Sequence, residues 1–321
     1  MIAIHQDKVK AVISKFPTEI KDQRSKAITA LERLIPSKNG NDLVYLNEII
    51  SLFKNNTDII IWEPERLVTE ISLVPTVPLI QKNYKKGPKM VKSVIKEDIL
   101  KALNYKNLRS SFYPKYFKEI GIKACVYCNS QLTVIAKKPK NGYSAKFDVD
   151  HYHSKDDYPF LSICLFNLYP ACSSCNRAKS KNKIEFGLYT NDTSKTKKSE
   201  YSFKLDSNTT AKYLTTKDST EINFSFDEPT YPIGIKSFNE SFHIEGIYQT
   251  QDDLIEELII KSQMYNNSYV KILKSNFNKL SINPELFKRT LVGNYTNEKD
   301  IHKRPMSKFV MDIAKQLGLI D

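Results

Sequence analysis

The sequence predicts an α+β protein in three parts, because the pattern of its residues changes twice along the 321-residue chain. Residues 1–120 carry apolar side chains at the spacing of amphipathic helices and are expected to be mainly helical. Residues 121–190 contain all five cysteines of the chain, four of them in two closely spaced pairs. Residues 191–321 mix short alternating runs, which are typical of strands, with further helical segments. A chain of this length can give each part a core of its own.

The first part is expected to fold into helices that are separated by prolines. Apolar residues recur every three or four positions, and Pro17 and Pro36 mark two boundaries. The expected helices cover residues 9–16, 28–35, 41–53 and 91–103. Residues 59–62, Ile-Ile-Ile-Trp, form an apolar run that indicates a short buried strand. Residues 81–96 hold six lysines and no acidic residue.

The segment 106–118 interleaves four cationic with four aromatic side chains. The cations are Lys106, Arg109, Lys115 and Lys118, and the aromatics are Phe112, Tyr113, Tyr116 and Phe117. Such a segment can stack on bases and neutralise phosphates. The favoured interpretation is an amphipathic packing segment with a solvated basic edge.

The third part is expected to contain both strands and helices. Strands are predicted over residues 222–226 and 242–244, which are bounded by Asp, Asn, Pro and Gly. One long helix is predicted from residue 252 to about 280, another after Pro284 and a last one from near Pro305. The chain shows no internal repeat and no low-complexity tract.

The chain is strongly basic, with 49 Lys and Arg against 36 Asp and Glu, a net charge of +13 and a pI near 9.2. This balance favours polyanionic partners, nucleic acid above all, although a merely basic surface has the same composition. No apolar run approaches the roughly 20 residues that a membrane span requires, and the first residues lack a run of signal-peptide length. We therefore expect a cytoplasmic protein whose thiols stay reduced.

Four cysteines form two Cys-x-x-Cys pairs: Cys125 with Cys128, and Cys172 with Cys175. Each pair lets two thiolates face one ion, and four thiolates in a tetrahedral array suit Zn²⁺ at a closed, structural site. A redox dithiol or chance spacing is the alternative. A zinc ion with four cysteine ligands has no open position for water, so any catalysis must come from the residues between the pairs. Cys164 is expected to be an ordinary buried residue.

The residues between the pairs carry three short motifs. They are Asp150-His151, the later Asn167-Leu168, and the ending Cys172-Ser-Ser-Cys-Asn-Arg-Ala-Lys179. Together they resemble the HNH (His-Me finger) endonuclease family, over roughly 70 residues. The resemblance implies a ββα-metal fold, in which a β-hairpin and a helix hold one divalent cation.

By the same resemblance, His151 corresponds to the general base that activates water, and Asp150 and Asn176 to the two metal ligands. Asn167 corresponds to a structural residue that steadies the loop of the base. Histidine is the side chain that titrates nearest neutral pH, and oxygen ligands suit Mg²⁺ or Mn²⁺. Because neighbours on a regular strand point to opposite faces, Asp150 and His151 share a site only if the strand ends or bulges there. Asp148, on the face of Asp150, is the alternative ligand.

Three cationic side chains near the motifs, Lys155, Arg177 and Lys179, are either phosphate contacts or solvated surface charges. His153 either contacts a phosphate or the metal, or is exposed to solvent. His243 and His302 have no ligand-like neighbours in the sequence and are expected to be structural.

The sequence of residues 150–159, Asp-His-Tyr-His-Ser-Lys-Asp-Asp-Tyr-Pro, resembles the corresponding segment of HNH proteins from bacterial anti-phage systems of the Septu and retron-linked types. This resemblance implies a DNA substrate and a separate ABC- or SMC-like ATPase, since the chain has no P-loop pattern. A ribonuclease of the same fold and a non-catalytic zinc module that binds nucleic acid or protein stay open. The helices at both ends either dock on such a partner or pack against each other.

Overall fold

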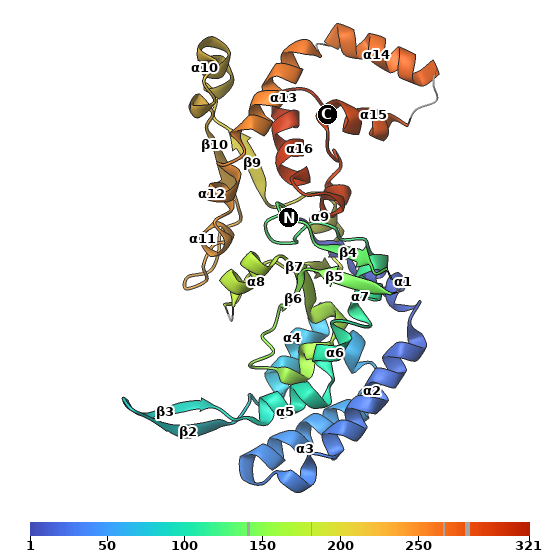
Figure 1. Cartoon of the computed structure of the whole chain (residues 1–321), viewed down its shortest axis with the longest axis vertical. Helices are drawn as coiled ribbons and strands as arrows, with labels where there is room; N and C mark the ends of the chain where they lie inside the picture. The colour runs from blue at the N-terminus through green and yellow to red at the C-terminus, as the bar shows by residue number, and fades with distance from the viewer. Residues whose placement is uncertain (140–141, 181, 266, 280–282) are drawn as a thin grey trace.

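The computed structural model describes residues 1–139, 142–180, 182–265, 267–279 and 283–321. The fold is α+β, as the sequence predicts, and the strands of the described residues pair into two-stranded sheets. The molecule is elongated, with helical regions at both ends and the cysteine-bearing part in the middle (Figure 1). The predicted boundaries between the three parts stay a prediction.

The N-terminal helices follow the predicted order, but the bounds of the first two were wrong: α1 covers Gln6–Ile13 rather than 9–16, and α2 covers Pro17–Glu32 rather than 28–35. Pro17 starts α2 and Pro64 starts α4, where the missing N–H of proline has no helical partner to lose. The helices are α1 (Gln6–Ile13), α2 (Pro17–Glu32), α3 (Gly40–Asn55), α4 (Pro64–Leu73), α5 (Ile95–Ala102), α6 (Tyr105–Leu108) and α7 (Tyr113–Ile120).

Two more predictions in this part were wrong. The apolar run at residues 59–62 contains a short 3-10 helix, η2 (Ile59–Ile61), rather than a strand. Its side chains are buried as predicted, but periodicity alone does not separate a buried strand from a buried helical turn. The helix predicted from residue 91 begins at Ile95, because residues before it form a hairpin of β2 (Leu79–Tyr84) and β3 (Gly87–Lys92).

The aromatic side chains of segment 106–118 are all buried, so the packing interpretation is confirmed. Phe112 and Tyr116 stack at 6.3 Å, and Phe112 also meets Phe16 of the N-terminal region edge to face. These aromatics are therefore core residues of the helical part and are not available as a stacking surface for bases.

In the middle part, two antiparallel strand pairs and one α-helix can be seen among the described residues. They are β4 (Val134–Lys137) with β5 (Tyr143–Lys146), β6 (Asp148–His151) with β7 (Leu168–Ala171), and α8 (Ser173–Lys179) directly after β7. Two 3-10 turns, η3 (Pro159–Ile163) and η4 (Leu165–Asn167), lead from β6 to β7. A short parallel pair joins β8 (Tyr189–Thr190) to β1 (Ile4–His5).

The C-terminal part contains one antiparallel pair, β9 (Ser202–Leu205) with β10 (Phe224–Asp227), so the strand predicted at 222–226 is confirmed in its second half. The remaining elements include 3-10 turns and α9 (Thr193–Lys197), α10 (Thr209–Thr216), α11 (Phe238–Phe242), α12 (Ile244–Tyr248), α13 (Asp252–Met264), α14 (Asn267–Lys279), α15 (Pro284–Val292) and α16 (Ser307–Gln316). The helices predicted after Pro284 and near Pro305 are confirmed.

Two further predictions failed in this part. Residues 242–244 are not a strand, because His243 adopts a left-handed conformation (φ 52°) that ends α11 and starts α12. The long helix predicted over residues 252–280 is divided into α13 and α14, and α13 ends at Met264, because the next residue, Tyr265, leaves helical geometry (ψ 58°). Residues 266 and 280 of that prediction lie outside the described residues.

One apolar core runs from Met1 to Ile320 and includes the cysteines of the middle part. Specific hydrogen bonds also join the middle to the C-terminal part. The hydroxyl of Tyr248 donates to the Cys128 carbonyl at 2.9 Å, and Asn129 donates to the Ile301 carbonyl at 3.0 Å. No helix among the described residues is long and apolar enough to cross a membrane.

Candidate functional site

The four paired cysteines come together in one buried cluster. The Sγ atoms of Cys125, Cys128, Cys172 and Cys175 all lie within 4.8 Å of one another, and none of the four forms a disulfide. Four sulfurs around one zinc ion at about 2.3 Å would lie about 3.8 Å apart. The spacing of the cluster, including 4.0 Å between Cys128 and Cys172, therefore fits a tetrahedral zinc site.

Local backbone structure positions both pairs. Gly121 ends α7 in the left-handed region (φ 82°) and turns the chain toward the first pair, while Cys172 is the N-cap of α8. The backbone N–H of Cys172 points at Cys125 Sγ (3.2 Å), and the Ser130 hydroxyl points at Cys128 Sγ (3.1 Å). Donors aimed at sulfur favour thiolates: hydrogen bonding to Cys125 and Ser130 lowers the pKa of Cys128, whereas burial raises the pKa of Cys125.

The two strands β6 and β7 and the helix α8 form one unit beside the cluster. The register pairs Asp150 with Tyr169 and His151 with Leu168, with no bulge in the strand. Alternation along β6 therefore places Asp148 and Asp150 on one face and Val149 and His151 on the other. The helix α8 covers the first face, because its Lys179 contacts Asp150 and its Asn176 contacts Asp148.

Asp150 is enclosed by two partners and is almost completely buried. The hydroxyl of Tyr127 donates to its Oδ2 at 2.5 Å, and Lys179 Nζ lies 3.1 Å from the same oxygen. Lys179 also donates to the His151 carbonyl at 2.8 Å, so its ammonium group lies in the interior rather than at a phosphate-binding surface. Burial raises the pKa of Asp150, and Lys179 opposes that shift.

Asp148 and Asn176 form the second contact between β6 and α8, and this one reaches the surface. Asn176 Nδ2 lies 3.2 Å from Asp148 Oδ2, and Arg109 Nη2 lies 3.3 Å from Asp148 Oδ1. The Asp148 side chain is 28% exposed, whereas that of Asp150 is 6% exposed. The alternative ligand Asp148, rather than Asp150, is therefore the carboxylate that lies beside Asn176.

His151 lies on the opposite face of β6, in the interior. Its Nε2 contacts the Ser162 carbonyl at 3.2 Å, and its ring lies 5.0 Å from the Tyr105 ring. A carbonyl can only accept, so Nε2 carries the proton and Nδ1 of the neutral ring is unprotonated. Burial, with the nearby charges of Lys155, Lys179 and Arg109, lowers the pKa of His151 to about 3.

Asn167 is fully buried and holds the chain that follows β6. Its Oδ1 accepts from the His153 N–H at 2.7 Å, and its Nδ2 donates to the carbonyls of His153 and Leu161, both at 3.1 Å. Replacing such a side chain would leave several buried backbone groups unpaired. These bonds are of the kind expected for a residue that steadies the loop after the histidine.

The remaining predicted residues lie around this unit without converging on one point. Lys155 lies 5.7 Å from the Tyr105 ring centre, and Arg177 is exposed on α8. His153 is half-buried, and burial lowers its pKa to about 4. His302 is buried and bonds the Ile2 carbonyl at 2.7 Å, which confirms its predicted structural role. Cys164 is buried outside the cluster, also as predicted.

The sequence does not single out Tyr105 and Tyr127 as contributors to the site, and it indicates Arg109 only as part of the basic edge of segment 106–118. Tyr105 lies beside that segment, and Tyr127 lies between the first two cysteines. The bond from Tyr127 to Asp150 had no signal in the sequence, since nothing in a Cys-x-x-Cys pair specifies what the intervening residues contact.

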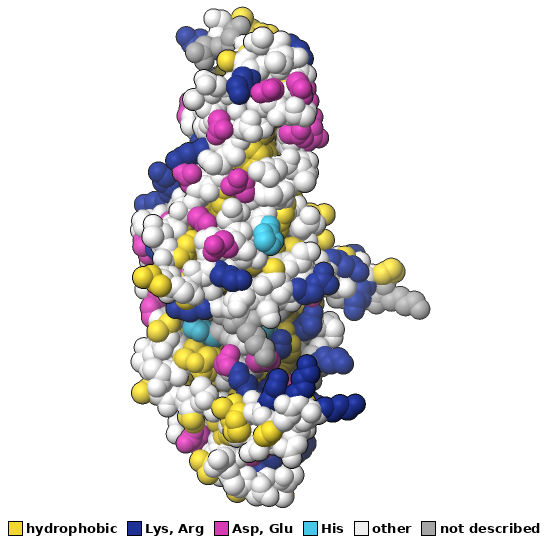
Figure 2. All heavy atoms as spheres, turned by 90° about the vertical axis from the view of Figure 1, so that its left-hand side faces the viewer, with side chains coloured by type: hydrophobic (Ala, Val, Ile, Leu, Met, Phe, Trp, Pro, Cys, Tyr) yellow, Lys and Arg dark blue, Asp and Glu magenta, His cyan; other side chains and the backbone are white. Residues whose placement is uncertain are grey.

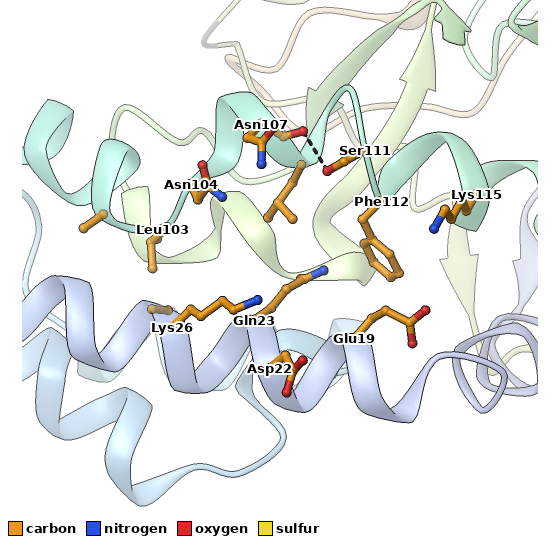
Figure 3. A pocket seen from close by; sticks show the side chains of 13 residues that line it. Glu19, Asp22, Gln23, Lys26, Leu103, Asn104, Asn107, Ser111, Phe112 and Lys115 are labelled. Atoms are coloured by element: carbon orange, nitrogen blue, oxygen red, sulfur yellow. Dashed lines mark hydrogen bonds between the residues drawn. The ribbon is translucent and has the colours of Figure 1, made fainter. Parts of the chain in front are cut away.

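Two cavities help to locate the site. One of about 260 Å³ lies against Val149 and is lined by the cations Lys106, Arg109 and Lys138. Another, of about 280 Å³, lies between α2 and the segment α5–α7 (Figure 3). Its lining contains none of the residues predicted for catalysis or metal binding. The cationic cavity next to Arg109 is therefore the one associated with β6.

The buried ion pair leads to a prediction about stability. Lys179→Met is expected to destabilise the fold by about 3–5 kcal/mol, because it leaves the Asp150 carboxylate buried without its cation. The measurement is urea unfolding of the variant and the wild type. Lys183→Met is the matched control, because Lys183 forms an exposed pair with Glu185 and should change little. Equal stability of both variants would contradict a structural role for the Asp150–Lys179 pair.

No protein-family model, no curated protein and no solved structure matches this chain.

Proposed function

We propose that the protein is a metal-dependent nuclease of the HNH type, acting on DNA. The observation that carries the proposal is the meeting of Asp148 and Asn176 on the unit β6–β7–α8, beside Arg109 and the cysteine cluster. A β-hairpin followed by a helix, with oxygen donors between them, is the arrangement that a ββα-metal module requires. The net charge of +13 supports a polyanionic substrate.

The residues at the β6–α8 contact fit a divalent cation. Asp148 offers a partly exposed carboxylate, and turning the Asn176 amide over would present Oδ1 in place of Nδ2. Asp150 does not fit as a ligand, because Tyr127 and Lys179 already occupy its oxygens. Asp148 and Asn176 would therefore hold Mg²⁺ or Mn²⁺, which would act as a Lewis acid on a phosphate.

The other roles follow from charge and protonation. His151 is the candidate base, because its neutral ring leaves Nδ1 free to accept a proton. Arg109 pairs with Asp148 on one face of β6, and its charge contributes to lowering the pKa of His151, after burial and the charges of Lys155 and Lys179. Arg109 and Lys155 are suited to neutralise a bound phosphate, and its negative charge would raise the proton affinity of His151.

A non-catalytic zinc protein that binds nucleic acid is the second candidate, and one observation favours it. His151 is only 3% exposed and lies on the face of β6 away from Asn176. In that case, His151 and Asn167 would be structural residues of the loop, and Asp148 and Asn176 a surface hydrogen bond. Binding of single-stranded RNA or of duplex DNA is compatible with both candidates, the nuclease and the non-catalytic zinc protein.

The deciding experiment is incubation of the purified protein with plasmid DNA, single-stranded DNA and total RNA, with and without Mg²⁺ or Mn²⁺. Metal-dependent cleavage of DNA supports the nuclease, cleavage of RNA alone supports the ribonuclease, and binding without cleavage supports the second candidate. Contaminating nucleases are controlled by purifying the variants below in the same way.

Asn176→Ala is expected to weaken cleavage through metal affinity, so that raised Mn²⁺ partly restores the rate. Asp148→Asn should behave in the same way, because both residues lie at the proposed ion. The measurement is the initial rate of plasmid cleavage as a function of Mn²⁺ concentration. Arg177→Ala is the control on the same helix, since its exposed side chain has no part in holding the ion. A loss that Mn²⁺ does not relieve in either variant would argue against this metal site.

The resemblance to ATPase-linked nucleases also leads us to propose a separate ATPase subunit, in an anti-phage system. Exposed apolar side chains on α13 and α14, Met264 and Ile272, offer a contact surface for it. The buried core that runs through all three parts supports the alternative, a self-contained shell. Co-expression with an ATPase encoded beside it, followed by size-exclusion chromatography and a cleavage assay, separates the two.

A further inference from the structure

The hairpin β2–β3 is an isolated ribbon on the surface. Six residue pairs join its strands, from Leu79 with Lys92 to Tyr84 with Gly87, and among the described residues neither strand pairs with a third one. Figure 1 shows the ribbon projecting beside α5, from the end of the molecule that holds α2 and α3. The turn Lys85–Lys86 is closed by Gly87, whose φ of 104° only glycine adopts readily. The ribbon is built as an arm rather than as part of a layered sheet.

The charge of this arm is entirely positive. Residues 81–96 contain six lysines and no acid, and Lys82 stands directly opposite Lys89 in the register. Like charges placed opposite each other destabilise a two-stranded ribbon. In the part of the chain that the structure describes, no ion pair is formed by four of these lysines: Lys82, Lys85, Lys86 and Lys89. Their charge is neutralised only if the arm meets an anion.

The base of the arm, in contrast, is tied to the loop that follows β6. Lys92 pairs with Asp157, and Lys96 lies 3.4 Å from Asp156. This loop also carries His153 and Lys155. The arm is thus anchored beside the candidate site while its free lysines extend outward. On the face shown in Figure 2, Lys and Arg gather from mid-height downward, and Asp and Glu are more frequent above.

We infer that the ribbon β2–β3 is a DNA-binding arm that lies in the major groove of B-form duplex DNA and contacts its phosphates through the four unpaired lysines. A two-stranded ribbon fits the roughly 12 Å width of that groove, whereas the deep, narrow groove of A-form RNA excludes it. Six residues per strand give a length of about 20 Å, enough to cross the groove. The inference rests on the proposed function, for which it names the substrate.

Lysines on exposed strand edges also prevent sheets from pairing with one another, and this is the alternative explanation of the arm. Edge protection does not require two lysines opposite each other and two more in the turn. The exposed Tyr84 and Met90 argue further against it, because they add apolar surface that an anti-association device would omit. In a groove the same side chains can contact sugars and thymine methyl groups.

The test compares two variants of the full-length protein, each with four Lys→Gln substitutions. The arm variant changes Lys82, Lys85, Lys86 and Lys89, and the control changes the exposed Lys21, Lys197, Lys198 and Lys299. Equal net charge in both variants separates the arm from a general charge effect. Fluorescence anisotropy measures the affinity for a labelled 20-base-pair duplex, without added divalent metal and over a series of salt concentrations.

We expect the arm variant to bind duplex DNA at least 10-fold more weakly than the control. The slope of log K against log salt should become shallower by about 3.6, since each of the four lost phosphate contacts contributes about 0.9. Unlabelled duplex RNA of the same sequence should compete less well than duplex DNA. Equal slopes for the two variants, or equal competition by duplex RNA, would overturn the inference.

Binding and cleavage separate the inference from the proposed function. If the wild-type protein needs its arm lysines to bind duplex DNA but cuts nothing with Mg²⁺ or Mn²⁺, the proposed nuclease activity is refuted and the DNA-binding arm is supported. If the protein cuts DNA and the arm variant binds as tightly as the control, only the DNA-binding arm is refuted. Circular dichroism of both variants verifies that the fold is retained.

Discussion

Cys125→Ser and, separately, Cys172→Ser are expected to lose the zinc ion and to unfold at a much lower temperature than the wild type. One side chain comes from each Cys-x-x-Cys pair, and either loss leaves a three-cysteine site. Structural zinc in small domains contributes about 10–16 kcal/mol of folding free energy, so the effect should be the largest of any single substitution. The measurement is elemental analysis for zinc, together with thermal unfolding.

The expected unfolding extends beyond the cysteine pairs themselves. Cys128 accepts a hydrogen bond from Tyr248, and the neighbouring Asn129 bonds both Ile301 and the N–H of Lys308. The first pair therefore supports the docking of the C-terminal part. Cys164→Ser is the control, because Cys164 is equally buried but lies outside the cluster. Zinc-free wild-type protein, with both pair variants as stable as it, would refute a zinc site.

Features of the fold set by local chemistry could be predicted from the sequence. Pro17 begins α2, Pro284 begins α15, and the cysteine spacing leads to a four-sulfur cluster. Each of these depends on residues within a few positions of one another, or on a ligand preference that the residue type itself carries. The α+β class followed from the same signals.

The predictions that failed depended on distant partners or on ambiguous short runs. Val91 and Ile95 are apolar at helical spacing, yet Val91 pairs with Ile80 across the hairpin, and the helix starts only at Ile95. Phe242 and Ile244 alternate as in a strand, but the Ser237–Glu240 capping box and the left-handed His243 make two short helices there. Capping at a short helix can outweigh two residues of alternation.

The sequence could predict which residues lie at the candidate site, but not which of them contact each other. Asp150, His151 and Asn176 all lie on or beside β6 and α8, as the motifs suggest. Which carboxylate faces Asn176 depends on how α8 packs across β6, and the long Lys179 side chain reaches Asp150 and leaves Asp148 for Asn176. The concern that neighbours on a strand face opposite sides applies in the structure, because β6 is regular up to His151.

His151→Gln is expected to reduce cleavage of DNA by at least about 10²-fold while it leaves zinc content and fold unchanged. The glutamine amide is long enough to donate a hydrogen bond to the Ser162 carbonyl, which His151 Nε2 reaches at 3.2 Å, but it cannot accept a proton from water as an imidazole does. His151→Ala should lose cleavage as well, with an added loss of stability from the cavity it leaves. The measurement is the single-turnover rate of plasmid cleavage at saturating Mn²⁺.

His302→Gln is the matched control for this prediction, because His302 is also buried, also bonds a backbone carbonyl through Nε2, and also has a pKa lowered by burial to about 3. Its neighbour is the Ile2 carbonyl, and it has no part in the contact between Asp148 and Asn176. A structural histidine should therefore lower the unfolding temperature in the variant and leave the rate per folded molecule unchanged. If His151→Gln behaves like His302→Gln in both respects, His151 is a structural residue, and the non-catalytic zinc protein becomes the better account of the chain.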